Sequence, residues 1–203
     1  MRLFPLFLKL RNRRCLVVGA GSIAEYKIAG LVDTGAKLRV IAPKATPKIR
    51  SWARSRKVDW EPRPFRLSDL KNIFLVIAAT SSRTLHEQIF KEAQRRGVLC
   101  NVVDVPELCD FFYPAVTRRG DLQIAISTAG QSPALAQRLR KKLEHQFAPE
   151  YANWLASVGK AREQILAGTR NADERKQLLH ALVSEEAFEK FRKRRKVPRR
   201  GKA

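Results

Sequence analysis

A short apolar run that ends in a glycine turn lies near the start of the chain. The run covers Arg14–Val18, glycines follow at positions 19 and 21, and Ala24 occupies the third position of the pattern. Apolar residues at helical spacing begin directly afterwards, and Gly35 is the expected end of that helix. Strand, glycine turn and helix in this order make the Gly-x-Gly-x-x-Ala pattern of a dinucleotide-binding unit, which requires a parallel sheet.

Each residue of the glycine turn has a physical role in this reading. Gly19 permits the tight turn, and Gly21 lacks the Cβ atom that would keep the backbone away from a pyrophosphate. Ala24 allows close packing of helix on strand, and Ser22 and Ile23 present backbone N–H groups to the phosphates. A tight structural turn that binds no ligand is the alternative, and we favour nucleotide binding.

The first half of the chain alternates between strand and helix patterns. We expect a Rossmann-like, doubly wound parallel sheet of the α/β class over residues 1–112, because this alternation is typical of right-handed βαβ units. The expected strands are 14–18, 37–42, 58–60, 72–79 and 98–103, and the expected helices are 22–34, 46–56 and one that carries Leu85, Ile89 and Ala93 and ends at Gly97.

The pattern changes after Asp104. Residues 111–117 and 122–127 predict an antiparallel hairpin with a turn over 118–121, and Ser132 with Pro133 predicts the start of a helix. Two strands cannot cover a core alone, so we expect residues 113–147 to be a small α+β segment that pairs with another chain. Residues 148–203 predict a helical region, with helices over 151–167 and 172–195 and a disordered basic tail from about 190.

The composition restricts the class of partner. The chain has 203 residues with 41 basic and 19 acidic side chains, and its net charge of +22 implies an anionic partner, either nucleic acid or a small polycarboxylate. The longest apolar run, 73–79, has the length of a strand, so no membrane span is expected. Cys15, Cys100 and Cys109 are odd in number and match no metal-binding spacing, which favours reduced thiols in a cytoplasmic protein.

Small and polar residues follow the predicted parallel strands, where ligands bind in such folds. The candidates beyond the glycine turn are Pro43, Lys44, Thr80, Asn101 and Asp104. The acidic residue expected about twenty positions after the glycines is absent, so the ribose is held by backbone groups, or Lys44 and Arg39 accommodate a 2′-phosphate; the residues leave NAD and NADP open.

Other candidate groups carry weaker signals. Asp104 could accept a proton or escort a metal ion, or it could simply cap a turn before Pro106. The loop 127–132 opens a helix and could be either a second anion site or an ordinary capped turn. None of the three histidines has metal-ligand spacing, and we expect His86, His145 and His180 on the surface.

Several motifs together resemble the precorrin-2 dehydrogenase family, which includes the N-terminal half of sirohaem synthase. The resemblance runs in order from about Arg2 to Leu143. Its motifs are Phe4-Pro5-Leu6-Phe7-Leu8, the glycine turn with Lys27, Ile77-Ala78-Ala79-Thr80, Asn101-Val102-Val103-Asp104-x-Pro106 and Ile126-Ser127-Thr128-Ala129-Gly130-x-Ser132-Pro133.

The resemblance implies an activity, a cofactor and an assembly. It implies NAD-dependent oxidation of precorrin-2, a polycarboxylate tetrapyrrole, to sirohydrochlorin on the way to sirohaem, with ferrous iron inserted in a second step by some members. It implies Asp104 as the catalytic carboxylate of both steps and a transient metal ligand, with no fixed metal site. Cofactor contacts map onto Ser22, Ile23, Pro43 and Lys44, and the homodimer exchanges the segment after the Rossmann domain.

The resemblance also suggests where the basic chain meets its substrate. Hypothetical contacts are Thr128, Gly130, Ser132, Arg118, Arg119 and Arg138. The chain departs from the family in its basic tail, in Thr128, where some members have serine, and in lacking the methyltransferase half of sirohaem synthase. The alternative reading, a non-enzymatic NAD-sensing module that binds nucleic acid, depends on the tail alone.

Overall fold

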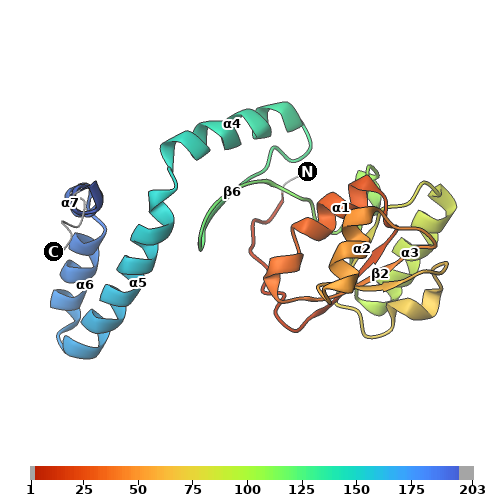
Figure 1. Ribbon diagram of the computed structural model, residues 1–203, viewed down its shortest axis with the longest axis horizontal. Helices are drawn as coiled ribbons and strands as arrows, with labels where there is room; N and C mark the ends of the chain where they lie inside the picture. The colour runs from red at the N-terminus through yellow and green to blue at the C-terminus, as the bar shows by residue number, and fades with distance from the viewer. Residues whose placement is uncertain (1–2, 197–203) are drawn as a thin grey trace, which may run out of the picture. The chain divides into compact units, whose positions relative to one another are not determined.

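The computed structural model describes residues 3–196 of the chain, which fold as two compact units (Figure 1). The first unit is Phe4–Phe112, and the second begins at Tyr113. In the part of the chain that the structure describes, no helix combines the length and the apolar character that crossing a membrane requires. Each unit has its own elements and is described separately.

The first unit contains a five-stranded parallel sheet in the order β3-β2-β1-β4-β5. The two central strands are β1 (Arg14–Val18) and β4 (Leu75–Ala78), and the others are β2 (Lys37–Ile41), β3 (Asp59–Glu61) and β5 (Leu99–Val102). Strand order reverses between β1 and β4, so right-handed crossovers place helices on both faces. The α/β doubly wound class expected from the sequence is confirmed.

The central strands are buried because helices cover them on both sides. All four residues of β4 are buried, as are Cys15–Val18 of β1. Ile89 and Ala93 of α3 (Arg83–Arg96) are fully buried among strand residues such as Leu16, Val76 and Cys100. The continuous apolar run of β4 therefore reflects burial on both faces, as parallel sheets require.

The predicted helix over 22–34 is wrong in its extent. The helix α1 (Ser22–Ala29) ends at Gly30, and a separate 3₁₀ turn, η1 (Val32–Thr34), completes the segment. Gly30 caps α1, and glycine is a poor interior residue of a helix. The remaining helical elements are α2 (Pro47–Arg54), η2 (Leu67–Leu70) and η3 (Pro106–Leu108).

The second unit combines a hairpin with helices. The strands β6 (Ala115–Arg119) and β7 (Leu122–Ile126) are antiparallel, and α4 (Pro133–Gln146) and α5 (Glu150–Gly168) follow. The prediction that the turn spans 118–121 is wrong, because Arg119 still pairs with Leu122 and the loop is only Gly120-Asp121. Gly120 has φ +57°, which suits the tight two-residue loop of a hairpin.

The last helical segment is also divided. In place of one helix over 172–195, α6 (Ala172–Leu182) and α7 (Glu185–Lys196) are separated at Val183-Ser184. Ser184 begins the second helix because its Oγ accepts a hydrogen bond from Ala187 N at 3.2 Å. The basic tail expected to be disordered from about 190 is therefore helical through Lys196, and residues 197–203 lie outside the described residues.

Aromatic rings hold the C-terminal helices together. The ring of Phe188 on α7 lies 4.5 Å from that of Tyr151 and 4.7 Å from that of Trp154, both on α5, measured between centroids. Contacts of this kind add to the free energy of burying the rings. They fix α7 against α5 even though α7 carries a strongly basic sequence.

Candidate functional site

The glycine turn lies against the end of the central strand β4. Gly19 has φ +103°, and its N–H donates to Ile41 O at 2.9 Å. A Cβ atom built on Gly19 would lie only 2.1 Å from Ala79 O, so no side chain fits here. The requirement for glycine at this position therefore comes from the protein's own backbone.

Gly21 differs from Gly19 because nothing in the protein requires it to be glycine. It precedes α1 in an extended conformation, and a Cβ atom built on it would meet no heavy atom within 4 Å. Ser22 and Ile23, the first residues of the helix, are exposed, whereas Ala24 is completely buried. The open space and the N–H groups of the first helical turn fit a dinucleotide pyrophosphate.

The loop after β2 is tied to the glycine turn by Thr46. Its N–H donates to Ala20 O at 3.1 Å, and its hydroxyl donates to a carboxylate oxygen of Glu25 on α1 at 2.6 Å. Pro43 and Lys44, the predicted cofactor contacts, are exposed in the same loop. Thr46-Pro47 is a typical start of a helix, but this local pattern gives no sign of the contact between Thr46 and the glycine turn.

The structure corrects the expectation that all three histidines are at the surface. His86 is only 6% exposed, and its Nε2 atom lies 3.0 Å from Thr80 Oγ1, directly after β4. Burial lowers the pKa of His86, the contact with Thr80 acts in the opposite direction, and the nearby charge of Arg83 lowers it further. His145 and His180 are exposed, as expected.

Two candidate residues lie at the end of β5. Asn101 is 6% exposed, and its Nδ2 donates to Phe111 O at 2.8 Å, while its Oδ1 has no hydrogen-bond partner within residues 3–196. Asp104 is exposed, and its φ of +61° turns the chain away from the strand. An amide oxygen that is buried and unbonded is costly, so it marks a place where a ligand N–H could bind.

Asp104 shares its surroundings with Lys27 of α1. Burial lowers the pKa of the half-buried Lys27, and the negative charge of Asp104 opposes this shift. Burial also raises the pKa of the Cys109 thiol, which donates to Val102 O at 3.1 Å. Lys27 of α1 and Asp104, which follows β5, are therefore electrostatic neighbours.

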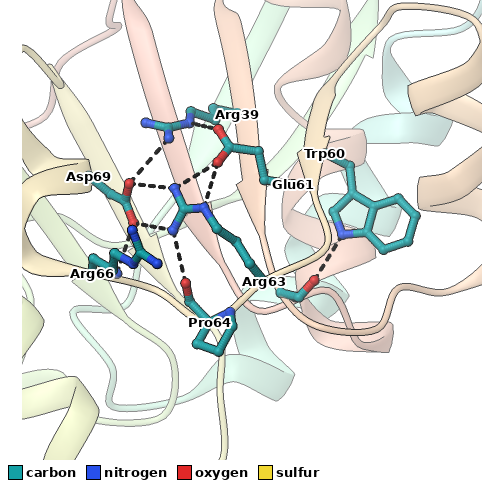
Figure 2. Close-up of polar contacts among 8 residues, drawn as sticks. Arg39, Trp60, Glu61, Arg63, Pro64, Arg66 and Asp69 are labelled. Carbon is teal, nitrogen blue, oxygen red and sulfur yellow. Dashed lines mark hydrogen bonds and ion pairs between the residues drawn. The ribbon is translucent and has the colours of Figure 1, made fainter.

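Arg39 belongs to a four-residue ionic network (Figure 2). Its Nε bonds to Glu61, and its Nη2 donates to Asp69 at 3.2 Å. Arg63 joins the same two carboxylates, with nitrogen-to-oxygen distances of 2.6 Å to Glu61 and 2.7 Å to Asp69. Arg39 is thus bound by Glu61 of β3 and Asp69 of η2, which argues against the alternative in which Arg39 and Lys44 together hold a 2′-phosphate.

The network also shows why no acidic side chain is available for the ribose. Glu61 ends β3 beside the end of β2, and both of its carboxylate oxygens are bound by arginines. Hydrogen bonding to Arg39 lowers the pKa of Glu61. Burial raises the pKa of Asp69, but its bonds to Arg63 and to Arg66 N outweigh burial and lower it overall.

Replacing Asp69 by asparagine should destabilise the first unit. Asp69 is only 6% exposed and accepts bonds from Arg39, Arg63 and the backbone N–H of Arg66. Removing a charge from such a partly buried network leaves its arginines poorly paired and costs about 2–3 kcal/mol. Urea unfolding followed by the fluorescence of Trp52 and Trp60 measures this loss.

A matched control is Glu87→Gln, which removes one partner of an exposed ion pair with Arg83. Its expected effect is below about 1 kcal/mol, because exposed ion pairs contribute little. Equal stabilities for the two variants would contradict a structural role for the network.

The network predicts a loss of stability in acid. The pKa values of Glu61 and Asp69 are lowered in the folded chain, so the folded state binds fewer protons than the unfolded state. Their contribution is therefore complete above their unfolded pKa values of about 4 and is lost as the pH falls through the lowered values. Unfolding free energies measured between about pH 5 and pH 2 should fall less steeply for Asp69→Asn than for the wild type.

A cavity of the first unit lies at the opposite ends of the strands. It has a volume of about 610 Å³ and is lined by the first residues of three strands, Arg14, Lys37 and Asp59, with Lys57 and Lys71 nearby. Parallel strands bind ligands at their carboxyl ends, so this cavity at the amino ends is not the dinucleotide site.

The predicted substrate contacts belong to the second unit. Thr128 Oγ1 accepts from Ser132 N at 3.2 Å, Ser132 Oγ accepts from Leu135 N at 3.2 Å, and Gly130 has φ +83°. Arg118 and Arg138 are exposed. The loop is thus a well-formed cap of α4, in which Ser132 N and Leu135 N are already bonded and Pro133 has no N–H group.

Arg119 has a structural role. Its guanidinium donates to Phe147 O at 2.7 Å, to Glu144 O at 2.9 Å and to Arg118 O at 2.9 Å. The bonds to Phe147 O and Glu144 O satisfy carbonyl groups at the C-terminal end of α4, which lack partners within the helix. The guanidinium of Arg119 therefore serves the fold rather than a substrate. Within residues 3–196, no three or more His, Cys, Asp or Glu side chains form a group that could hold a metal ion.

Comparisons with known proteins cover both units. The family described as "Putative NAD(P)-binding" matches residues 6–115, so the first unit is an NAD(P)-binding domain, and the "Sirohaem biosynthesis protein central" family matches residues 119–146. Among solved structures, SirC, precorrin-2 dehydrogenase, is 26% identical with a TM-score of 0.78, and the match covers 91% of each chain.

Curated relatives are longer proteins. A siroheme synthase of Nitrosococcus oceani is 38% identical over 165 residues, which are 81% of this chain and 35% of that protein. A siroheme synthase of Neisseria meningitidis serogroup C is 35% identical over 176 residues, 87% of this chain and 37% of that protein. This chain spans little more than a third of the length of these relatives. It belongs to the precorrin-2 dehydrogenase family, to which the N-terminal region of siroheme synthases also belongs.

Proposed function

We propose that this chain catalyses the NAD-dependent oxidation of precorrin-2 to sirohydrochlorin in sirohaem biosynthesis. The observation that carries the proposal is the likeness to SirC, a precorrin-2 dehydrogenase, because it extends over both units rather than over the nucleotide-binding unit alone. The glycine turn and the exposed Asp104 at the end of β5 agree with this activity. An excess of basic residues favours a polycarboxylate substrate.

Residues of the first unit bind the dinucleotide, and one of them accepts a proton from the substrate. The backbone at Gly19 and Gly21 and the first turn of α1 hold the dinucleotide, with Pro43, Lys44, Thr80 and Asn101 around it. When bound, NAD would accept the hydride that precorrin-2 loses. Asp104 accepts the proton that precorrin-2 releases, and the ammonium group of Lys27 is an electrostatic neighbour of that carboxylate.

The second unit supplies contacts to the substrate. The loop before α4 contributes Gly130 and the hydroxyl groups of Thr128 and Ser132, which can donate hydrogen bonds, and Arg118 and Arg138 offer exposed cations. Carboxylate side chains of a tetrapyrrole are the groups that such donors recognise. Their contribution should weaken as salt is added, because the cations are exposed.

The decisive test is anaerobic incubation of the purified chain with precorrin-2 and NAD. We expect the absorbance spectrum of sirohydrochlorin and one equivalent of NADH per product. A folded chain that binds NAD and forms no product would refute the proposed reaction. Replacing NAD by NADP in the same assay settles which dinucleotide is used.

Iron insertion is a second proposed step, with ferrous iron as a substrate and Asp104 as its transient ligand. Incubation of sirohydrochlorin with ferrous ion should give the sirohaem spectrum faster with the chain than without it. Equal rates with and without the chain would remove the chelatase activity from the proposal.

We also propose a homodimer that exchanges the segment 113–147, in the cytoplasm. The two-stranded sheet β6–β7 is too small to be covered on its own, and Phe4 and Phe7 are 84% and 69% exposed. A second copy of the chain would bury these surfaces, and the free cysteines Cys15, Cys100 and Cys109 suit a reducing compartment. Analytical ultracentrifugation should give twice the mass of one chain.

A further inference from the structure

His86 lies behind the glycine turn and is joined to it through Thr80. The imidazole Nε2 is 3.0 Å from Thr80 Oγ1, and the side chain is buried at 6% exposure. His86 belongs to the first turns of α3, and its backbone N–H donates to Ser82 O at 3.1 Å. A buried polar side chain needs a hydrogen-bond partner. The imidazole of His86 meets this need by bonding to Thr80, and the bond holds the threonine side chain in place.

Thr80 in turn lies beside Gly19. A Cβ atom built on Gly19 would lie 3.3 Å from the Thr80 methyl carbon and 2.1 Å from Ala79 O, so the turn packs directly on this part of the chain. The hydroxyl and the methyl group of a threonine are attached to the same carbon, so fixing one fixes the other. The bond to His86, together with a longer one of 3.4 Å that Thr80 Oγ1 accepts from Ser82 N, therefore determines which group Thr80 presents to Gly19.

We propose that His86 is a positioning residue for the bound dinucleotide, which it supports by holding Thr80 against Gly19. The inference rests on the proposed NAD-dependent function and adds a residue that does not touch the cofactor. His86 acts from α3, on the inner side of the turn, whereas the cofactor occupies the outer side, where Gly21 leaves open space. The contact needs a hydrogen-bonding atom at the position of Nε2, and a positive charge is not required.

Binding of NADH, measured by its fluorescence, tests the proposal without depending on precorrin-2. His86→Leu should raise the Kd about tenfold, the usual effect of losing one such hydrogen bond. Thr80→Val, which keeps the shape and removes the hydroxyl, should raise the Kd at least as much. The double variant should match Thr80→Val alone, because both changes break the same contact. His86→Gln, whose amide reaches a similar position, should stay within about threefold of the wild type.

Two controls separate this role from a general loss of folding. His180→Leu makes the same substitution at an exposed position of α6 and should leave the Kd unchanged. In steady-state assays, His86→Leu should raise KM for NAD while kcat changes less than about twofold, because the reacting groups are untouched.

The outcomes are distinct. A Kd for His86→Leu equal to that of the wild type, or effects of His86→Leu and Thr80→Val that simply add, would overturn the proposal. If His86→Leu does not fold, the other two variants test the proposal. Wild-type NADH binding by Thr80→Val would overturn the proposal. Weak NADH binding by Thr80→Val, with near-normal binding by His86→Gln, would support it. A wild-type chain that does not bind NADH would refute the proposed function itself.

Discussion

Replacing Asp104 by asparagine should lower kcat for precorrin-2 oxidation by about a hundredfold to ten-thousandfold, the range for a lost general base. Asparagine has the same shape and tolerates the left-handed backbone that Asp104 adopts at φ +61°. Because it removes only the basic oxygen, the fold and the Kd for NADH should stay unchanged. Stopped-flow measurement of NADH formation under saturating NAD gives kcat directly.

The matched control for Asp104 is Glu107→Gln. Glu107 is an exposed acid three residues later, and it is bonded only to the exposed Arg83 at 3.5 Å in the part of the chain described here. This variant should oxidise precorrin-2 at the wild-type rate. If Asp104→Asn also retained the wild-type rate, another group would have to accept the proton.

Replacing Gly19 by alanine should prevent the first unit from folding normally. The new methyl group would lie 2.1 Å from Ala79 O, and an alanine would have to adopt φ +103°. Strain and steric overlap together should cost more than about 3 kcal/mol, a large part of the stability of a domain of this size. Urea unfolding followed by tryptophan fluorescence should show a lower midpoint or no cooperative transition.

Gly21→Ala is the matched comparison, since its methyl group meets nothing within 4 Å. The loss of stability should be within about 1 kcal/mol, as for other changes at the start of a helix. Binding of NADH should weaken about a hundredfold, because the methyl group enters the space assigned to the pyrophosphate. Normal NADH binding by folded Gly21→Ala would show that the dinucleotide lies elsewhere.

The contrast between these glycines shows what the sequence could reveal about the site. The pattern around Gly19, Gly21 and Ala24 is local, and local signals also predicted β1 at its observed bounds. The pattern could not separate a glycine needed by the backbone from one needed by a ligand. That difference depends on Ala79, sixty residues away along the chain, and appears only once β1 and β4 are paired.

The errors of prediction have different causes. His86 lies three residues before Ile89 and seven before Ala93, so its helical spacing already placed it on the buried face of α3, and the polar character of histidine suggested the surface. Arg119 stands in an Arg-Arg-Gly-Asp stretch that is typical of a turn, yet it pairs with Leu122 as the last residue of β6, and its guanidinium binds carbonyl groups at the end of α4. The partners of Arg39 lie 22 and 30 residues further along, beyond the range of any sequence period.

The loops around the dinucleotide site are joined to one another by backbone hydrogen bonds. Gly19 N donates to Ile41 O, Thr46 N to Ala20 O, and Ala79 N to Val18 O, at 2.8–3.1 Å. The platform is therefore preorganised, and binding should order few additional residues. Calorimetry of NADH binding should then give a small heat-capacity change, in contrast to the large negative values of coupled folding and binding.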